Sequence, residues 1–171
     1  MRIVLLVLLV TSMHAAFAQQ PPSPCRTMAE YRQFDFWIGE WDVFRKNGMK
    51  AGDSRIELIL DSCVILENWA GSNGVYSGKS FNTFNGVTKQ WQQTWVDNQG
   101  GTIEFLEGGF AGNRMQFMSR PFPMTGDTVG IRRLSFHLLS ADIVRQHGEI
   151  SKDNGVTWST EYDLEYRRKR K

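Results

Sequence analysis

Apolar and polar side chains alternate with a period of two along most of the chain from residue 34 onward. The alternating segments are short and are separated by Gly, Asn and Asp, which favours antiparallel β-strands over helices. The pattern predicts a first strand that begins near Trp41, followed by strands at residues 54–60, 63–70, 74–85, 88–97, 102–110, 114–120, 130–139, 143–151 and 156–168. Asn85 and Gly86 predict a type I′ hairpin turn, because both central positions of that turn need a positive φ.

The regular spacing of these segments predicts an all-β fold, either a barrel or a sandwich. Residues 34–168 form this single domain in our prediction. Residues 28–34 are the one segment whose pattern allows a short helical turn, and the sequence contains no internal repeat. A mature chain of roughly 150 residues is enough for one domain with a real hydrophobic core.

The first 18 residues have the three parts of a secretory signal peptide. Arg2 supplies the positive region, residues 3–10 are all apolar, and Ala-Phe-Ala at 16–18 matches the pattern before a cleavage site. The apolar run is far shorter than the ~20 residues of a membrane-spanning helix. We therefore expect residues 1–18 to be removed from an exported protein, periplasmic or secreted, with no transmembrane segment. Residues 19–33 would form a Pro-rich leash and the short helical turn.

Two cysteines, Cys25 and Cys63, remain after removal of this leader. An even number of cysteines in a small exported domain predicts a disulfide, which would tie the leash to the barrel. Two widely spaced cysteines without a CxxC or HxxxH motif supply too few ligands for a metal ion. No metal site is expected.

Positive charge is concentrated at the C-terminus. Residues 167–171 are all Arg or Lys, so the pI near 8.6 reflects this end of the chain and no basic face. Nucleic-acid binding would require basic and aromatic side chains spread together over one surface. We expect no nucleic-acid partner and read residues 169–171 as a basic tail; the sequence leaves the oligomeric state open.

The segment FDFWIGEW at residues 34–41 resembles the lipocalin and wider calycin signature, in which a glycine precedes a tryptophan by two positions. Here these residues are Gly39 and Trp41. The resemblance implies that Trp41 closes one end of the barrel and that a basic residue of the last strand stacks across its ring. Alternation along the last strand gives this role to Arg168, or to Arg167 after a one-residue slip.

Nearly the whole mature chain also resembles a family of bacterial exported proteins catalogued as a domain of unknown function. The segments that carry this resemblance are FDFWIGEW at 34–41, the strand at 63–69, GKSF at 78–81, WQQTW at 91–95 and SKDNGVTW at 151–158. The resemblance implies a calycin-like antiparallel barrel of ten or a similar number of strands. It implies no particular activity.

Residues 151–158 also match the Asp-box pattern S-x-D-x-G-x-T-W, which sialidases carry in several copies. We expect a structural hairpin turn here. Asp153 would accept hydrogen bonds from backbone N–H groups, Gly155 would adopt a left-handed conformation, and Trp158 would pack beneath the turn. A single copy of the motif does not indicate a glycosidase.

Tryptophans and polar side chains share several strand faces, which predicts a ligand pocket inside the barrel. A closed barrel of this size can hold one small ligand. Buried carboxylates need partners, for which arginines are the natural choice. The expected pocket residues are Glu67 and Trp69 on one strand, Trp91, Gln93 and Trp95 on another, Glu107 on a third, and Arg133 and Arg145 as partners of the carboxylates.

The favoured function is therefore an exported barrel that binds a small apolar or amphipathic molecule. A barrel enzyme is an alternative, in which Glu67 or Glu107 acts as acid or base beside Arg133 or Arg145. Two carboxylates could also catalyse glycoside hydrolysis, although no motif singles out either glutamate. The sequence contains no G-x-S-x-G nucleophile elbow.

A third possibility is haem binding through His137 or His147, the two histidines of the mature chain. It arises because the chain resembles nitrobindin-type barrels in size and strand content. Neither histidine lies in a recognisable motif. No cofactor is expected under the favoured function.

Overall fold

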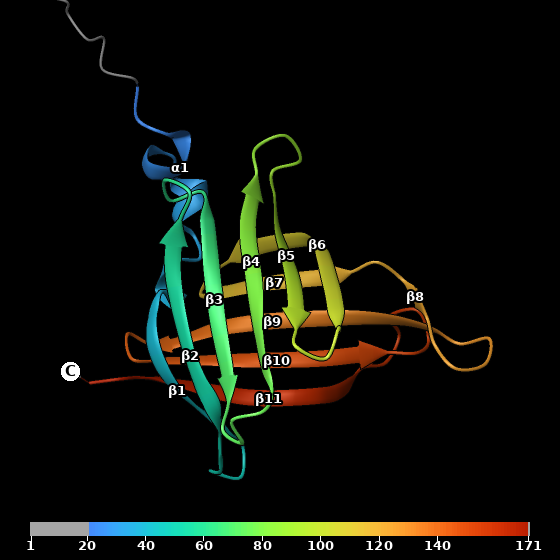
Figure 1. Ribbon diagram of the computed structural model, residues 1–171. Coiled ribbons are helices and arrows are strands. Elements are labelled where there is room, and N and C mark those ends of the chain that lie inside the picture. The colour runs from blue at the N-terminus through green and yellow to red at the C-terminus, as the bar shows by residue number, and fades with distance from the viewer. Residues whose placement is uncertain (1–20, 171) are drawn as a thin grey trace, which may run out of the picture.

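The structure, a computed structural model, describes residues 21–170 and consists of a closed barrel of ten antiparallel strands (Figure 1). Each strand pairs with its neighbours in sequence, except that β7 pairs with β9, and pairing of β11 with β1 closes the ring. The strands of the barrel are β1 (Gly39–Arg45), β2 (Lys50–Ile59), β3 (Val64–Gly71), β4 (Ser77–Asn85), β5 (Gln90–Asp97), β6 (Thr102–Ala111), β7 (Arg114–Ser119), β9 (Val129–Ser140), β10 (Ile143–Ser151) and β11 (Ser159–Arg168). The predicted fold class, an all-β antiparallel barrel of about ten strands, is confirmed.

Two local predictions are corrected. The two-residue strand β8 (Phe122–Pro123), which pairs with the start of β9, was not predicted. The β4–β5 hairpin exists, but its turn is not type I′. Lys89 has the positive φ, of 59°, and the Asn85 side chain accepts hydrogen bonds from the backbone N–H groups of Val87 and Thr88. The backbone carbonyl of Asn85 also accepts from the Lys89 N–H at 2.8 Å, so Asn85 satisfies three N–H groups of this longer turn.

Three short helical turns precede the barrel, where one was predicted over residues 28–34. They are α1 (Pro24–Thr27) and the 3-10 turns η1 (Ala29–Arg32) and η2 (Asp35–Trp37). None of the helical turns in residues 21–170 has the length and apolar character needed to cross a membrane. The predicted signal peptide at residues 1–18 lies outside the described residues.

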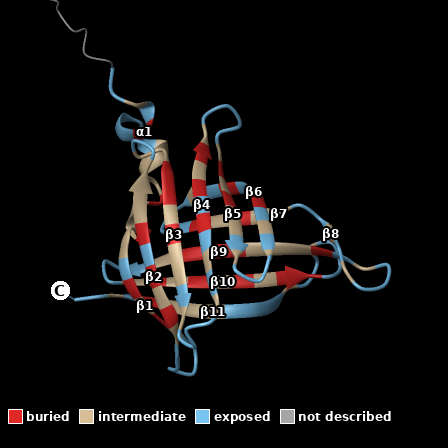
Figure 2. Cartoon of the chain, viewed as in Figure 1, coloured by how far each residue is buried: buried red, intermediate tan, exposed pale blue. Residues whose placement is uncertain are grey.

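The N-terminal segment carries a group of aromatic rings into one end of the barrel. Phe34, Trp37 and Trp41 are completely buried, and Figure 2 shows other buried residues recurring along the surrounding strands. Phe34 stacks on Trp37 with ring centroids 5.1 Å apart and meets Phe136 of β9 at 4.9 Å. Such offset and edge-to-face pairs add to the burial of apolar area. Phe34, Trp37 and Trp41 fill this end of the barrel, and we call these three residues the tryptophan plug.

Trp41 and Arg168 form the closure that the calycin resemblance implies. The Arg168 guanidinium lies 4.2 Å from the ring centroid of Trp41 and donates to the carbonyl of Ile38 at 2.9 Å. The Trp41 Nε1–H donates to the carbonyl of Trp37 at 2.9 Å. Gly39 has φ +139°, and a side chain at this position would meet Arg168. Glycine is therefore required for Arg168 to cross the tryptophan.

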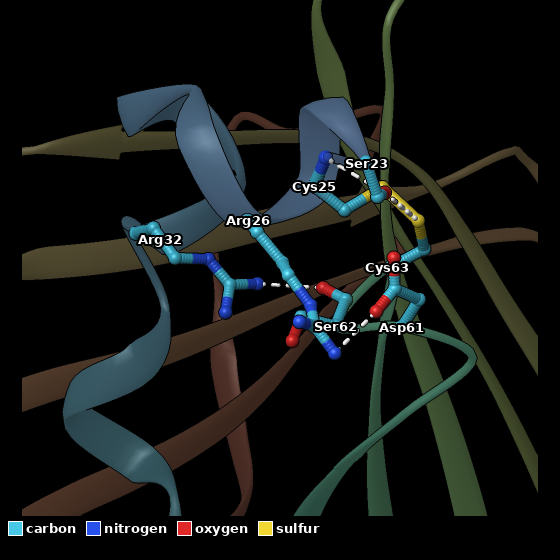
Figure 3. The surroundings of a disulfide bond; sticks show 7 residues. All are labelled: Ser23, Cys25, Arg26, Arg32, Asp61, Ser62 and Cys63. Atoms are coloured by element: carbon cyan, nitrogen blue, oxygen red, sulfur yellow. Dashed lines mark hydrogen bonds and ion pairs between the residues drawn. A yellow bond between two sulfur atoms is a disulfide. The ribbon is translucent and has the colours of Figure 1, made fainter. Parts of the chain in front are cut away.

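The predicted disulfide between Cys25 and Cys63 is present and joins the first helical turn to the start of β3 (Figure 3). The disulfide holds an unusual turn in place. In this turn Leu60, Asp61 and Ser62 all have a positive φ, of 49°, 54° and 71°. Left-handed conformations are unfavourable for residues with a Cβ. The N-terminal segment holds the turn at further points as well: Arg26 pairs with Asp61 at 2.5 Å, and Arg32 donates to the carbonyl of Ser62 at 2.7 Å.

The Asp-box segment forms a hairpin turn between β10 and β11. Asp153 accepts hydrogen bonds from the backbone N–H and the hydroxyl of Thr157, and these donors lower the pKa of its carboxyl to about 2. Gly155 has φ +87° and its carbonyl accepts from the Trp158 indole at 3.1 Å. Arg133 stacks on the other side of that indole, 4.1 Å from its centroid. In this protein the Asp-box segment therefore has a structural role, which is to shape the turn between β10 and β11.

Candidate functional site

A cavity of about 210 Å³ occupies the end of the barrel opposite to the tryptophan plug. The plug contacts the end of β4 and the start of β5 through Phe84 and Trp91. The cavity is lined by the other end of β5, where Trp95 lies, and by Trp69 near the end of β3. The site is therefore at the end of the barrel where β3 and β5 finish (Figure 1).

The lining is mostly aromatic, with a small polar group at its inner side. Its aromatic members are Trp69, Tyr76, Trp95, Phe105, Tyr162 and Tyr166. Ile103 and Leu164 complete the apolar wall, and Glu67, Gln93 and Gln146 are the polar members. Few polar groups among many aromatic ones is the usual composition of a small-molecule site. At about 210 Å³ the cavity is below the ~300–1,000 Å³ range of pockets for drug-sized ligands, so it encloses little more than one ring or a short branched chain.

Three of the aromatic rings lie against glycines of the neighbouring strand. A Cβ atom at Gly52, Gly78 or Gly148 would collide with the ring of Trp69, Trp95 or Tyr162, in that order. Because these glycines have no side chain, each ring can lie along the barrel wall instead of crossing the interior. This arrangement keeps the cavity open while most of each ring stays in contact with protein.

Glu67 is the buried ionisable group of the site, with 2 % of its surface exposed. Its Oε1 accepts hydrogen bonds from the hydroxyls of Ser54 at 2.9 Å and Tyr166 at 3.2 Å, and its Oε2 accepts from Ser80 at 2.9 Å. Burial raises the pKa of Glu67, because removal from water penalises the charged form, and the three hydroxyl donors lower it by a smaller amount. No arginine, lysine or histidine lines the cavity in the described part of the chain.

A chain of buried amides continues this network away from Glu67. Gln93 Nε2 donates to Asn82 Oδ1 at 2.6 Å, and Asn82 Nδ2 donates to both the Ser80 hydroxyl and the Ile65 carbonyl at 3.0 Å. The donors therefore point from Gln93 through Asn82 and Ser80 to Glu67. This order suits an ionised carboxylate at the end of the chain.

Tyr166 connects Glu67 to the opposite wall of the barrel. Its hydroxyl lies 3.2 Å from Glu67 Oε1 and 3.0 Å from Gln146 Oε1, both of which accept hydrogen bonds. A phenol has one hydrogen, so it donates to one of these oxygens at a time. Burial and the nearby Glu67 raise the pKa of Tyr166 well above its ordinary value. Tyr166 thus remains a neutral hydroxyl that can serve either acceptor.

Half of the eight predicted pocket residues line this cavity. The structure brings together Glu67, Trp69, Gln93 and Trp95. Trp91 points into the barrel as expected, but it packs against Phe34 of the plug, and its Nε1–H donates to Gln33 Oε1 at 3.1 Å. The prediction was correct that Trp91 points into the barrel, and wrong about which end of the barrel it occupies.

Glu107 was predicted to point into the pocket and is instead exposed on the outside of β6. The register between β6 and β7 shifts between Phe105 and Glu107, which is a β-bulge. The extra residue of a bulge reverses the alternation that follows it. Consequently Phe105 lines the cavity, whereas Glu107 does not. The pair of carboxylates considered for glycoside hydrolysis is not assembled.

The predicted arginine partners of the buried carboxylate are also wrong. Arg133 pairs with Glu149 at 2.8 Å, and Arg145 pairs with Asp163 at 2.7 Å, on the outer surface of β9, β10 and β11. Three hydroxyls take the place of an arginine around Glu67. These arginines have nearer carboxylates on their own face, so they have no reason to enter the barrel.

Both histidines lie on this outer surface too. His147 Nε2 is 3.0 Å from the Thr160 hydroxyl, and its Nδ1 is 3.7 Å from Glu149. Burial and the charges of Arg114 and Arg145 lower the pKa of His137. Neither imidazole faces the cavity, so this site offers no histidine ligand to a haem.

Seven lining residues were not in the predicted set: Tyr76, Ile103, Phe105, Gln146, Tyr162, Leu164 and Tyr166. Tyr162, Leu164 and Tyr166 alternate along β11 and so share the face of Arg168, which the prediction used for the closure of the barrel. Gln146 alternates with the buried Val144 and Gly148 on β10. A polar side chain at an inward position of a buried strand is the signal that would have revealed it.

Comparisons with known proteins give no family for this chain. No family model matches it, and a search of curated proteins found no relative.

Proposed function

We propose that this protein is an exported barrel that binds one small amphipathic molecule at the open end of its interior. The observation that carries the proposal is the cavity of about 210 Å³ with Glu67, Gln93 and Gln146 set among aromatic rings. Buried polar groups do not stabilise a core better than apolar side chains of the same volume. A ligand that uses these groups gives them a role.

Export is the second part of the proposal. It is supported by the disulfide between Cys25 and Cys63, because such bonds persist in oxidising compartments. The signal-peptide pattern at residues 1–18 points the same way. Membership of the bacterial exported family with the FDFWIGEW segment is likewise a proposal, supported by the order of the shared segments.

The test is ligand recovery followed by binding. Protein purified from its native host would be analysed by native mass spectrometry for a co-purifying small molecule. The recovered compound is expected to quench tryptophan fluorescence, since Trp69 and Trp95 line the cavity. A Trp95→Ala variant should bind at least about tenfold more weakly, equivalent to about 1.4 kcal/mol.

The matched control is Trp158→Ala, which removes a half-buried tryptophan outside the cavity. Its affinity should equal that of the parent protein. Circular dichroism would verify that both variants are folded. Equal loss of affinity in the two variants, or a ligand that maps to the outer surface, would contradict the proposal.

A further inference from the structure

The cavity contains a buried acid without a countercharge. Glu67 is the single carboxylate in the lining, and within residues 21–170 no basic side chain joins it there. Arg133 and Arg145, which the sequence predicted as its partners, are held by Glu149 and Asp163 on the outer surface. An ionised carboxylate in such a place is unfavourable unless something positive approaches it.

The hydrogen bonds around Glu67 leave one acceptor position open. A carboxylate can accept about four hydrogen bonds. Ser54 and Tyr166 occupy Oε1, and Ser80 alone occupies Oε2. Among residues 21–170, one lone-pair direction of Oε2 therefore has no donor. A ligand with one N–H group fits this position.

Tyr166 allows the site to exist in two protonation states. When Glu67 is ionised, the Tyr166 hydroxyl donates to Glu67 Oε1. When Glu67 is neutral, its own O–H can donate to Tyr166, which then donates to Gln146 Oε1 at 3.0 Å. In both states each of these hydroxyls has a hydrogen-bond acceptor. Loss of the Glu67 proton therefore requires only rotation of O–H groups.

The walls around this acid present the faces and edges of aromatic rings. Trp69, Trp95 and Tyr162 lie along the barrel wall over glycines, and Tyr76 contacts Trp95 with ring centroids 6.4 Å apart. Aromatic faces attract cations, most strongly where water is excluded. A carboxylate with a free acceptor position inside an aromatic enclosure is complementary to a cation that carries apolar substituents.

We propose that the ligand is a small organic cation, a protonated amine on a single ring or a short branched chain, whose N–H pairs with Glu67. This inference rests on the proposed binding function and names its ligand class. The apolar part of the ligand lies among Trp69, Trp95 and Tyr162. Binding of the cation favours ionised Glu67, so at a pH where the empty site is protonated, binding releases a proton.

The pH dependence of this site comes from Glu67. The other ionisable groups that face it are the phenols of Tyr166 and Tyr162 on β11 and of Tyr76 before β4; β2, β4, β5 and β10 contribute Ser54, Ser80, Gln93 and Gln146, which do not ionise. The pKa values of all three phenols are raised, so they stay neutral. Affinity for an amine therefore increases as pH rises through the pKa of Glu67, up to the pKa of the amine itself.

The experiment compares three probes of one shape and different charge: benzylamine, benzyl alcohol and benzoate. Isothermal calorimetry should give an affinity for benzylamine at least about tenfold above that for benzyl alcohol, equivalent to about 1.4 kcal/mol. Above the pKa of Glu67 benzoate should not bind, because the ionised carboxylate repels it. Below this pKa, calorimetry with benzylamine in two buffers of different ionisation enthalpy should detect the released proton.

Two variants complete the design. Glu67→Gln should reduce the affinity for benzylamine to no more than that for benzyl alcohol and should abolish the proton release. Glu107→Gln, which neutralises an exposed glutamate outside the cavity, should behave as the parent protein. The comparison of the three probes uses the parent protein alone, so it remains valid if a variant does not fold. Equal or tighter binding of benzyl alcohol overturns the cation inference alone, whereas no binding of any probe overturns the proposed cavity function as well.

Discussion

Removal of Trp41 should be the most damaging single change to an aromatic side chain. The indole is completely buried, and burial of a tryptophan removes roughly 150–250 Å² from water. At ~25 cal/mol per Å² this corresponds to about 4–6 kcal/mol. Trp41→Ala also breaks the hydrogen bond to the Trp37 carbonyl and the stacking with Arg168. Because the alanine and partial collapse of the site recover some of this energy, we expect a loss of about 4 kcal/mol.

The assay is guanidinium unfolding followed by far-ultraviolet circular dichroism, which does not rely on the removed fluorophore. Trp158→Ala is the matched control, because Trp158 is also stacked by an arginine, at 4.1 Å, but is only half-buried. The control should lose about 1 kcal/mol. The reasoning is refuted if Trp41→Ala is no more destabilising than Trp158→Ala. A double-mutant cycle with Arg168→Ala should assign about 0.5–1 kcal/mol to the stacked pair.

The remaining predictions concern the disulfide and the turn that it holds, which contains Leu60, Asp61 and Ser62. Replacing both Cys25 and Cys63 by serine should lower the free energy of unfolding by about 2–4 kcal/mol, because the bond closes a loop with a sequence separation of 38; a reductant should destabilise the parent and leave the double variant unchanged. Leu60→Gly should stabilise the protein by about 1 kcal/mol, since Leu60 is 72 % exposed with a φ of 49°. Leu139→Gly, at an exposed strand position with ordinary φ, should do the opposite, and equal signs for the two would contradict the strain assigned to Leu60.

The strands could be predicted because alternation is a local property of each strand. Each of the ten barrel strands corresponds to a segment predicted from alternation, and the turn residues between them separate one strand from the next. A barrel rather than a sandwich was implied only by the calycin resemblance. The short strand β8 was missed because a two-residue segment has no period and contains Pro123. The closure by Trp41 and Arg168 was accessible because the register of the last strand fixes which arginine faces the tryptophan.

The errors at the site came from β-bulges and from position along the barrel axis. A bulge before Glu107 turned that side chain outward. Gly108 and Gly109 follow it, and glycine inside a strand is a signal of a bulge that alternation alone does not use. Alternation says which face a side chain occupies, but not which end of the barrel. Trp91 and Trp95 share a face of β5. Trp91 packs against the plug, whereas Trp95 lines the cavity. Only the packing of the N-terminal rings decides between them.

The two ends of the barrel use the same kinds of side chain for different purposes. At the closed end Arg168 covers one side of the Trp41 ring. The indole N–H of Trp41 is hydrogen-bonded within the protein. At the open end Glu67 is surrounded by hydroxyl donors with one acceptor position left unused. An aromatic enclosure alone would bind neutral apolar molecules. A buried acid within it adds selection by charge, and this is why the comparison of an amine with its matching alcohol is the decisive measurement on this protein.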